Sequence, residues 1–261
     1  MWSYFEPEER IWYRWRLNGA EAWLRKDGDE WRLAAKAVRF SEAADEADGP
    51  EPAEPPEPDG AIVAVSRGSR VALRPLMPDR PYMIASRSDV RIHEGSEAVF
   101  RLDLPVMLSF QIEGGEILRD FMPFKLSNTW FGDKSAGSLC YCLPTALDPE
   151  CRGESAACAG AEAPRRRSLA RCEIFVRNAH KAVLHVEHLA VYTELLSLYD
   201  RDGYLETDRV AVEGQPDSGL KMSVVKRAAD RRGELLVGAR VGQSELMVRR
   251  GVGFLRAIAG M

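Results

Sequence analysis

The stretch Ala98-Val-Phe-Arg-Leu-Asp-Leu-Pro-Val-Met-Leu-Ser-Phe-Gln-Ile112 decides the fold class. Every even position from 98 to 112 is apolar, whereas the odd positions include Arg101, Asp103 and Gln111. Alternation with a period of two gives a strand one buried face and one solvated face. Because Pro105 has no N–H to donate to a ladder, the pattern predicts either an edge strand or two strands that meet at a break.

The same alternation continues on both sides of this stretch. Residues 10–38 predict a three-stranded meander, because Asn18-Gly19 and Asp27-Gly28 supply the tight turns that short hairpins need. Five of the six tryptophans lie within the first 31 residues, and on alternating strands we expect them to fill a core. Further strand patterns lie at 61–112, 171–177, 182–192, 220–224 and 235–241.

These patterns predict an all-β fold of sandwich-like antiparallel sheets, in one or two packed sandwich units. Residues 244–258 predict one short C-terminal helix. The segment 41–60 holds eight acidic residues, five prolines and no base, so we expect a disordered linker or loop there. The predicted organisation is an N-terminal meander at 1–40 that packs on the main body, the acidic linker at 41–60 and the β-sandwich body at 61–261.

Composition excludes several classes of protein. No run approaches the ~18 apolar residues of a transmembrane helix. The start, MWSYFEPEER, lacks the basic-then-apolar order of a secretory signal. We therefore expect a cytoplasmic protein in which the five cysteines are reduced.

Charge is distributed unevenly along the chain. Residues 41–60 account for the overall net charge of −4, and without them the remainder carries +4. Nucleic acid is not favoured as a partner, because the acidic segment would repel phosphate. Residues 247–261 would form a basic, amphipathic helix that suits a peripheral membrane surface or the groove of a partner. The alternative is that this helix docks on the chain's own sheet.

Cysteines and histidines gather between residues 140 and 188, which raises the possibility of a metal or thiol-redox site. Zinc takes thiolate and imidazole ligands, usually from paired C-x2–4-C motifs. Here the closest pair is Cys140-Tyr-Cys142, so the spacing is not that of a zinc knuckle. The alternating pattern places His188 in line with the apolar Leu184 and Val186. The candidate ligand set is Cys140, Cys142, Cys172 and His188, and the competing interpretation is small buried thiols with a satisfied histidine.

Motifs of the common enzyme classes are absent from the sequence. It contains no nucleophile elbow, Walker loop, dinucleotide glycine fingerprint or H-E-x-x-H. Its acidic residues outside 41–60 are scattered with no histidine in register. We therefore expect a non-enzymatic protein that needs no cofactor.

One segment is distinctive enough to suggest a family. Leu126-Ser-Asn-Thr-Trp-Phe-Gly-Asp133, followed by Gly137-Ser-Leu-Cys-Tyr141, resembles an uncharacterised prokaryotic family, domain-of-unknown-function family 432. The likeness extends in outline over nearly the whole chain, and it implies no activity.

The same segment is the candidate binding site. Trp130 and Phe131 form a large aromatic pair beside a glycine, and the polar side chains around them suit a ligand or partner pocket. The block could equally pin a crossover loop to the core. The candidate residues are Ser127, Asn128, Thr129, Trp130, Phe131, Gly132 and Asp133.

The leading functional hypothesis is a non-enzymatic binding or regulatory module that engages a protein partner. We expect contact through the sheet edge near Pro105 or through the basic C-terminal residues. The alternative is a zinc, iron or thiol-redox protein that uses the cysteines and histidines of 140–188.

Overall fold

The structure is a computed structural model that describes residues 2–39, 49–56, 60–65, 69–131, 138–143, 167–215, 219–226 and 233–242. The chain divides into two compact units, and each is built from segments that are not contiguous in sequence. Unit 1 comprises residues 1–76, 105–125 and 166–168. Unit 2 comprises residues 77–104, 126–165 and 169–261. This division differs from the predicted boundary at 41–60, because residues 61–76 and 105–125 belong with the N-terminal meander.

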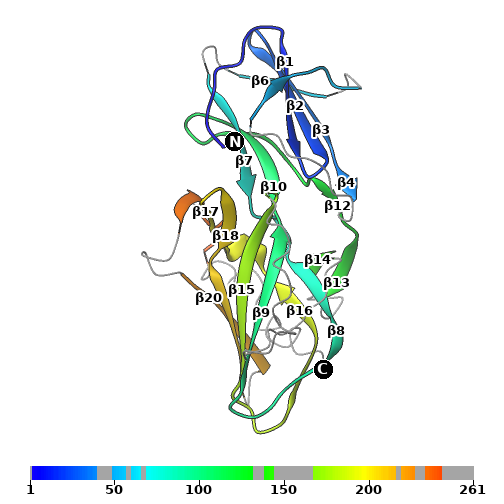
Figure 1. The fold of residues 1–261 in the computed structure, drawn as a ribbon, viewed down its shortest axis with the longest axis vertical. Coiled ribbons are helices and arrows are strands. Elements are labelled where there is room, and N and C mark those ends of the chain that lie inside the picture. The colour runs from blue at the N-terminus through cyan, green and yellow to red at the C-terminus, as the bar shows by residue number, and fades with distance from the viewer. Residues whose placement is uncertain are drawn as a thin grey trace. The chain divides into compact units, whose positions relative to one another are not determined.

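The N-terminal meander forms as predicted and is the centre of a five-stranded sheet in unit 1 (Figure 1). Asn18 and Gly19 both have positive φ, 49° and 82°, which is the backbone that a type I′ hairpin turn requires. The strand order is β5-β1-β2-β3-β6, and all its pairs are antiparallel. The strands are β1 (Trp12–Leu17), β2 (Ala20–Asp27), β3 (Glu30–Lys36), β5 (Glu51–Pro52) and β6 (Ala61–Ala64).

A three-stranded sheet, ordered β11-β10-β7, supplies the other half of the core of unit 1. The ring of Trp15 on β1 packs edge-on against Phe110 on β10, with the centroids 5.4 Å apart. A short parallel pair, β4 with β12, completes the unit. The strands are β4 (Val38–Arg39), β7 (Val71–Leu76), β10 (Met107–Ile112), β11 (Ile117–Phe121) and β12 (Phe124–Lys125).

Unit 2 contains a four-stranded sheet and a seven-stranded sheet. The four-stranded sheet has the order β13-β14-β8-β16. In the larger sheet, β20-β19-β15-β18-β17-β21 form one path and β9 pairs with β15. The strands of the smaller sheet are β8 (Tyr82–Ile92), β13 (Asn128–Phe131), β14 (Ser138–Cys142) and β16 (Leu184–Val191). The strands of the larger sheet are β9 (Glu97–Pro105), β15 (Leu169–Asn178), β17 (Leu198–Arg201), β18 (Tyr204–Thr207), β19 (Arg209–Gln215), β20 (Gly219–Val225) and β21 (Glu234–Val237). A single 3-10 turn, η1 (Thr193–Leu195), lies between β16 and β17 among the described residues.

The stretch 98–112 forms two strands rather than one. β9 ends at Pro105 and β10 begins at Met107, so the break falls where proline withholds its N–H. The apolar side chains from Phe100 to Phe110 at even positions are all buried, as predicted. The predicted solvated face is present only before the break, because the odd positions Met107, Ser109 and Gln111 of β10 are buried as well. The chain passes from unit 2 into unit 1 at this point.

The all-β prediction is confirmed, and so is the role of the N-terminal tryptophans. Trp2, Trp12, Trp15, Trp23 and Trp31 are all buried. The sheets are not purely antiparallel, however. β14 runs parallel to β8, and β15 runs parallel to β18 and β19, because longer connections than hairpin turns join these strands.

Two predicted segments meet the limits of the described residues. The C-terminal helix at 244–258 and the basic residues 247–261 lie outside them. Within the acidic segment 41–60, residues 49–56 and Gly60 are described, and Glu51–Pro52 forms the strand β5 against β1. Within the described part of the chain, no helix is both long enough and apolar enough to cross a membrane.

Candidate functional site

The LS-x-TWFG block forms an edge strand of unit 2. Asn128–Phe131 is β13, which pairs with β14 at one end of the four-stranded sheet. Trp130 is 60% exposed, so it does not pin a loop to the core. Ser127 and Asn128 are exposed as well, whereas Thr129 is half-buried. Gly132 and Asp133, the other predicted site residues, lie outside the described residues.

Strand register determines which backbone groups of β13 face outward. The N–H of Cys142 donates to the carbonyl of Ser127 over 2.8 Å, so these two residues form a hydrogen-bonded pair. Hydrogen-bonded pairs alternate along an antiparallel ladder, which makes Thr129 and Cys140 the next such pair. Asn128 and Trp130 therefore direct their N–H and C=O groups away from β14. No other strand of the described chain pairs with this side of β13.

The side chains of Asn128 and Trp130 share one face with an aromatic and cationic pair. Asn128 is directly opposite Tyr141 in the ladder, so both side chains project to the same side. The guanidinium of Arg80 lies over the Tyr141 ring, 5.4 Å from its centroid. An Arg80 N–H also donates to Oδ1 of Asn128 over 3.3 Å. We call Arg80, Asn128, Trp130 and Tyr141 the β13 shelf.

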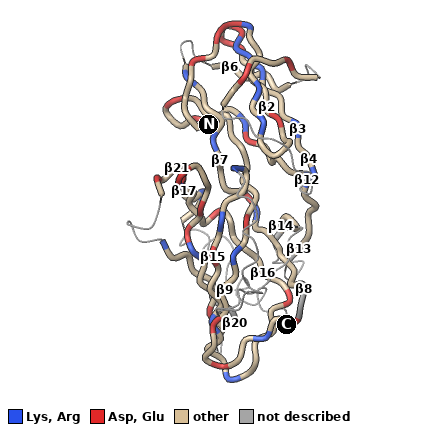
Figure 2. Tube along the Cα trace, viewed as in Figure 1, with Lys and Arg blue, Asp and Glu red and all other residues tan. Residues whose placement is uncertain are grey.

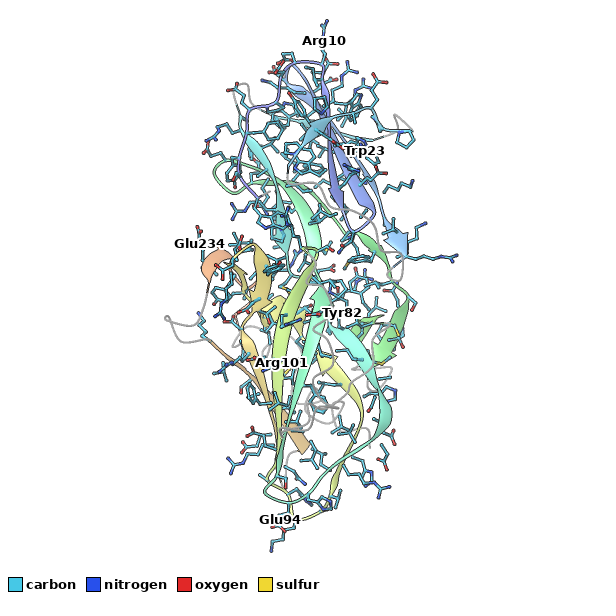
Figure 3. All side chains as sticks on the ribbon, viewed as in Figure 1. Arg10, Trp23, Tyr82, Glu94, Arg101 and Glu234 are labelled. Atoms are coloured by element: carbon cyan, nitrogen blue, oxygen red, sulfur yellow. The ribbon has the colours of Figure 1, made fainter. Side chains whose placement is uncertain are left out.

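Buried contacts hold the β13 shelf in position. The hydroxyl of Thr193, which is fully buried, donates to the carbonyl of Arg80 over 2.7 Å. The N–H of Tyr141 donates to the carbonyl of Pro81 over 2.9 Å. The ring of Tyr82, which Figure 3 labels, is fully buried and packs 5.9 Å from the ring of Tyr141, centroid to centroid. Arg80 and Tyr141 therefore project from a fixed backbone.

The electrostatics of the shelf suit binding more than proton transfer. Burial raises the pKa of the Tyr82 hydroxyl well above its ordinary value, with a further contribution from Tyr141. Tyr82 therefore stays protonated and neutral at physiological pH. Arg80 supplies a cation that is partly exposed, and Trp130 supplies an apolar plane. Such a combination is typical of protein-binding surfaces, where aromatic residues and arginine are enriched.

Sequence reasoning missed Arg80 and Thr193, and it singled out Tyr141 only as part of a resemblance. Arg80 stands 48 residues before Asn128 in the sequence, and β8 and β14 are the elements that bring the two together. The one local signal was Pro81, which disfavours a helical backbone at the preceding Arg80, and the structure has a bend at Asp79 and Arg80.

The predicted metal ligands do not come together. Cys140 and Cys142 lie on β14, and Cys172 lies on β15 in the other sheet, where it is buried with its Sγ 4.0 Å from the carbonyl of Asp208. Over the described residues, no three His, Cys, Asp or Glu side chains are placed to hold a metal ion. Cys140, Cys142 and Cys172 are not in disulfide bonds.

His188 does not occupy the buried position that its sequence pattern predicted. A β-bulge between Val186 and His188 shifts the register of β16 against β8. Val186 stands opposite Val90 whereas His188 stands opposite Ala85, so β8 has three more residues than β16 across the irregularity. Beyond it the alternation does not continue in phase: Val186 and Leu189 are both buried, and His188 is exposed. Alternation alone cannot reveal such a shift.

Exposed apolar side chains of the described chain gather on strands at the ends of sheets. Five of the seven large ones lie on β6, β11, β13, β20 or β21, each of which ends a sheet. Edge strands that expose both backbone groups and apolar side chains are where added strands bind. These five are Ile62, Ile117, Trp130, Val225 and Leu235.

Comparison with known proteins places the chain in a family without assigning an activity. No curated protein and no solved structure matches it. One family model matches residues 1–252, which is nearly the whole chain and includes every strand described above. The chain therefore belongs to the family described as "Protein of unknown function (DUF432)".

Proposed function

We propose that the protein is a non-enzymatic binding module that takes up an extended segment of a partner protein as an added strand on β13. The observation that carries the proposal is the outward backbone of Asn128 and Trp130 beside the 60% exposed Trp130 side chain. Strand addition supplies main-chain hydrogen bonds, and pockets or anchors for alternate side chains supply selectivity. Cys140, Cys142 and Cys172 are reduced, which fits a reducing compartment and supports a cytoplasmic location as part of the same proposal.

The β13 shelf supplies the selectivity. Trp130 presents a wide apolar plane at the edge, and large aromatic side chains are frequent hot spots in interfaces. The Arg80 guanidinium, stacked on Tyr141, stands beside the same edge and can pair with a carboxylate or a carbonyl of the partner. The proposed ligand is therefore an extended segment with an apolar side chain to cover Trp130.

The contribution of Trp130 follows from its exposure. A tryptophan presents roughly 250 Å² of side-chain surface. Since 60% is exposed, complete coverage would bury about 150 Å². At about 25 cal/mol per Å² this amounts to almost 4 kcal/mol, and ordering of the segment offsets part of it. We expect Trp130→Ala to weaken binding by about 100-fold.

Selection from a displayed peptide library on the immobilised full-length chain tests the proposal. Peptides selected on the wild type are measured against Trp130→Ala and against Ile62→Ala, which removes an equally exposed side chain (61%) from β6. The proposal requires a loss of affinity in the Trp130 variant and unchanged affinity in the Ile62 variant. Equal affinity for all three chains would contradict it.

A second pair of variants separates the backbone from the side chain. Asn128→Pro removes an N–H that faces outward, whereas Asn128→Ala removes only the side chain and keeps that donor. Strand addition predicts weaker binding to the proline variant than to the alanine variant. Binding that depends on the side chains alone predicts no difference between them. Circular dichroism of both variants checks that the fold is retained.

A further inference from the structure

One face of the five-stranded sheet in unit 1 interleaves arginine with tryptophan. In the β1–β2 ladder, Arg14 stands opposite Trp23 and Trp12 stands opposite Arg25. Arg32 of β3 stands opposite Arg25 and extends the same face. Figure 2 shows basic positions along β2 and β3, and Figure 3 labels Trp23 on the sheet. We call Trp12, Arg14, Arg16, Trp23, Arg25 and Arg32 the Arg–Trp face. Two acidic residues lie on the same side: Glu21, opposite Arg16, pairs with Arg14 over 3.3 Å, and Asp27 pairs with Arg25 over 3.4 Å.

Several donors on this face are buried without an acceptor. Among the described residues, three buried side-chain N–H donors of the Arg–Trp face have no hydrogen-bond partner. A buried donor without an acceptor is destabilising by roughly 1–3 kcal/mol, so a cluster of them calls for an explanation. The three atoms are Nε1 of Trp23, Nε of Arg25 and Nε of Arg32. Because these atoms are buried, a ligand reaches only the outer parts of the arginines, whose side chains are 29–39% exposed at Arg14, Arg16 and Arg25.

The chain's own acidic segment already touches this face. Glu51 on β5 accepts hydrogen bonds from Nε and Nη2 of Arg14, over 3.1 and 2.6 Å. Nε of Arg16 lies 3.1 Å from the same carboxylate oxygen as an ion pair. The Arg14 hydrogen bonds, with the charge of Arg16, lower the pKa of Glu51. Glu51 is therefore ionised at physiological pH and held by two arginines.

The backbone of the acidic segment also fits the edge of β1. Glu51 stands opposite Arg14 in the ladder, and Pro52 stands opposite Tyr13. The N–H of Ala53 donates to the carbonyl of Trp12 over 3.0 Å, which makes Trp12–Ala53 and Arg14–Glu51 the hydrogen-bonded pairs. The nitrogen of Pro52 then faces away from β1, where a missing N–H has no consequence. A proline-containing acidic segment is thus compatible with this edge.

We propose that the Arg–Trp face and the adjoining edge of β1 form a second binding surface, which recognises extended acidic segments. Residues 49–56 are its intramolecular ligand. The partner class is a protein segment of the same chemistry, with carboxylates spaced by proline or small residues, and it competes with residues 49–56. This surface is separate from β13 and does not depend on the function proposed for that strand.

Binding of a labelled synthetic peptide of residues 47–58 (ADGPEPAEPPEP) to full-length variants tests the proposal. Glu51→Arg repels Arg14 and Arg16 and should release the intramolecular segment. We expect fluorescence anisotropy to show at least tenfold tighter peptide binding to this variant than to the wild type, because an intramolecular ligand competes at millimolar effective concentration. Glu54→Arg is the matched control, since it makes the same change of charge on an exposed residue of the same segment. It should bind the peptide as weakly as the wild type.

Substitution of Arg14 and Arg16 tests whether these arginines bind the peptide. In the Glu51→Arg background, Arg14→Gln and Arg16→Gln should each reduce peptide binding, because each removes a cation without restoring a pair with residue 51. Tryptophan fluorescence, which comes mainly from the buried tryptophans of unit 1, checks that the variants are folded. Equal binding to the Glu51 and Glu54 variants, or equal binding of a scrambled peptide of the same composition, would overturn the proposal.

Discussion

The buried carboxylate of Asp208 offers a direct test of how unit 2 is held together. Asp208 is only 1% exposed and lies between β18 and β19. Its Oδ2 accepts the N–H of Ser197 over 3.0 Å, and its Oδ1 accepts the hydroxyl of Tyr199 over 2.9 Å. The carboxylate therefore ties the segment after η1 and the strand β17 to the start of β19.

Replacement of Asp208 by alanine removes both acceptors and leaves two buried donors without partners. A hydrogen bond to a charged group contributes about 1.5–3 kcal/mol. Two such bonds give about 3–6 kcal/mol, and relief from burying a carboxylate offsets part of this. We expect Asp208→Ala to lower the free energy of unfolding by about 3 kcal/mol. At about 2–4 °C per kcal/mol for a protein of this size, Tm should fall by roughly 6–12 °C.

Differential scanning calorimetry measures the change in Tm. A second substitution, at Tyr199, tests whether the lost hydrogen bonds of Asp208 cause it. Tyr199→Phe should destabilise the wild type by about 1.5 kcal/mol, because one acceptor of Asp208 loses its donor. In the Asp208→Ala background the same change should destabilise by less, because the hydrogen bond between the two side chains is already absent. Asp200→Ala is the control, because its carboxylate bonds an exposed turn at Gly203. Additive effects of the two substitutions, or a Tm within 1 °C of the wild type for Asp208→Ala, would refute this account.

Three further predictions concern other parts of the described chain. Asn178→Ala should lower the free energy of unfolding in urea by about 3 kcal/mol, because the fully buried amide donates to the carbonyls of Ile92 and Ala182 and accepts the N–H of His180. Gly233→Ala should speed hydrogen exchange in β21, since a Cβ there would lie 1.8 Å from the carbonyl oxygen of Asp200; unchanged exchange would contradict this packing. The lowered pKa of Glu51 means that the contact with Arg14 stabilises the fold fully above pH 4.5, the ordinary pKa of a glutamate, and is lost as the pH falls through the lowered pKa. An NMR titration of the carboxyl carbon should give a midpoint below 4.5, and Arg14→Gln should raise that midpoint.

Local patterns predicted the strands but not their partners. The alternation at 98–112 and the pairs Asn18-Gly19 and Asp27-Gly28 report on residues close in sequence, and those strands form, with the second turn one residue later, at 28–29. The pairing of β7 with β10 joins residues 71–76 to 107–112, in a unit whose segments are separated by others, and no local pattern encodes it. The register shift beside His188 was also hidden, because it arises from additional residues on the partner strand β8.

The candidate site was predicted in part. The distinctive Trp130 block drew attention to β13, but its exposure and outward backbone depend on where β14 pairs. The acidic segment was expected to be disordered, since charge repulsion and proline oppose burial. Arg14 and Arg16 provide the countercharge that holds Glu51, and alternation on β1 does place these two side chains on one face. The placement of Arg14 and Arg16 on one face was visible in the sequence and could have been recognised as a countercharge for the acidic segment.

The discontinuity of unit 1 has a consequence for its synthesis on the ribosome. The strands β1 to β3 are joined by two-residue turns, so this meander can form as soon as it leaves the exit tunnel. The rest of unit 1 cannot form until residues 105–125 are synthesised, because they supply β10, the partner of β7. Ser168 follows later, and its hydroxyl accepts a hydrogen bond from the buried Asn18 side chain. During that interval the side of Trp15 that later contacts Phe110 is open to other chains. A nascent chain arrested before residue 105 is therefore the form of this protein on which we expect a chaperone to act.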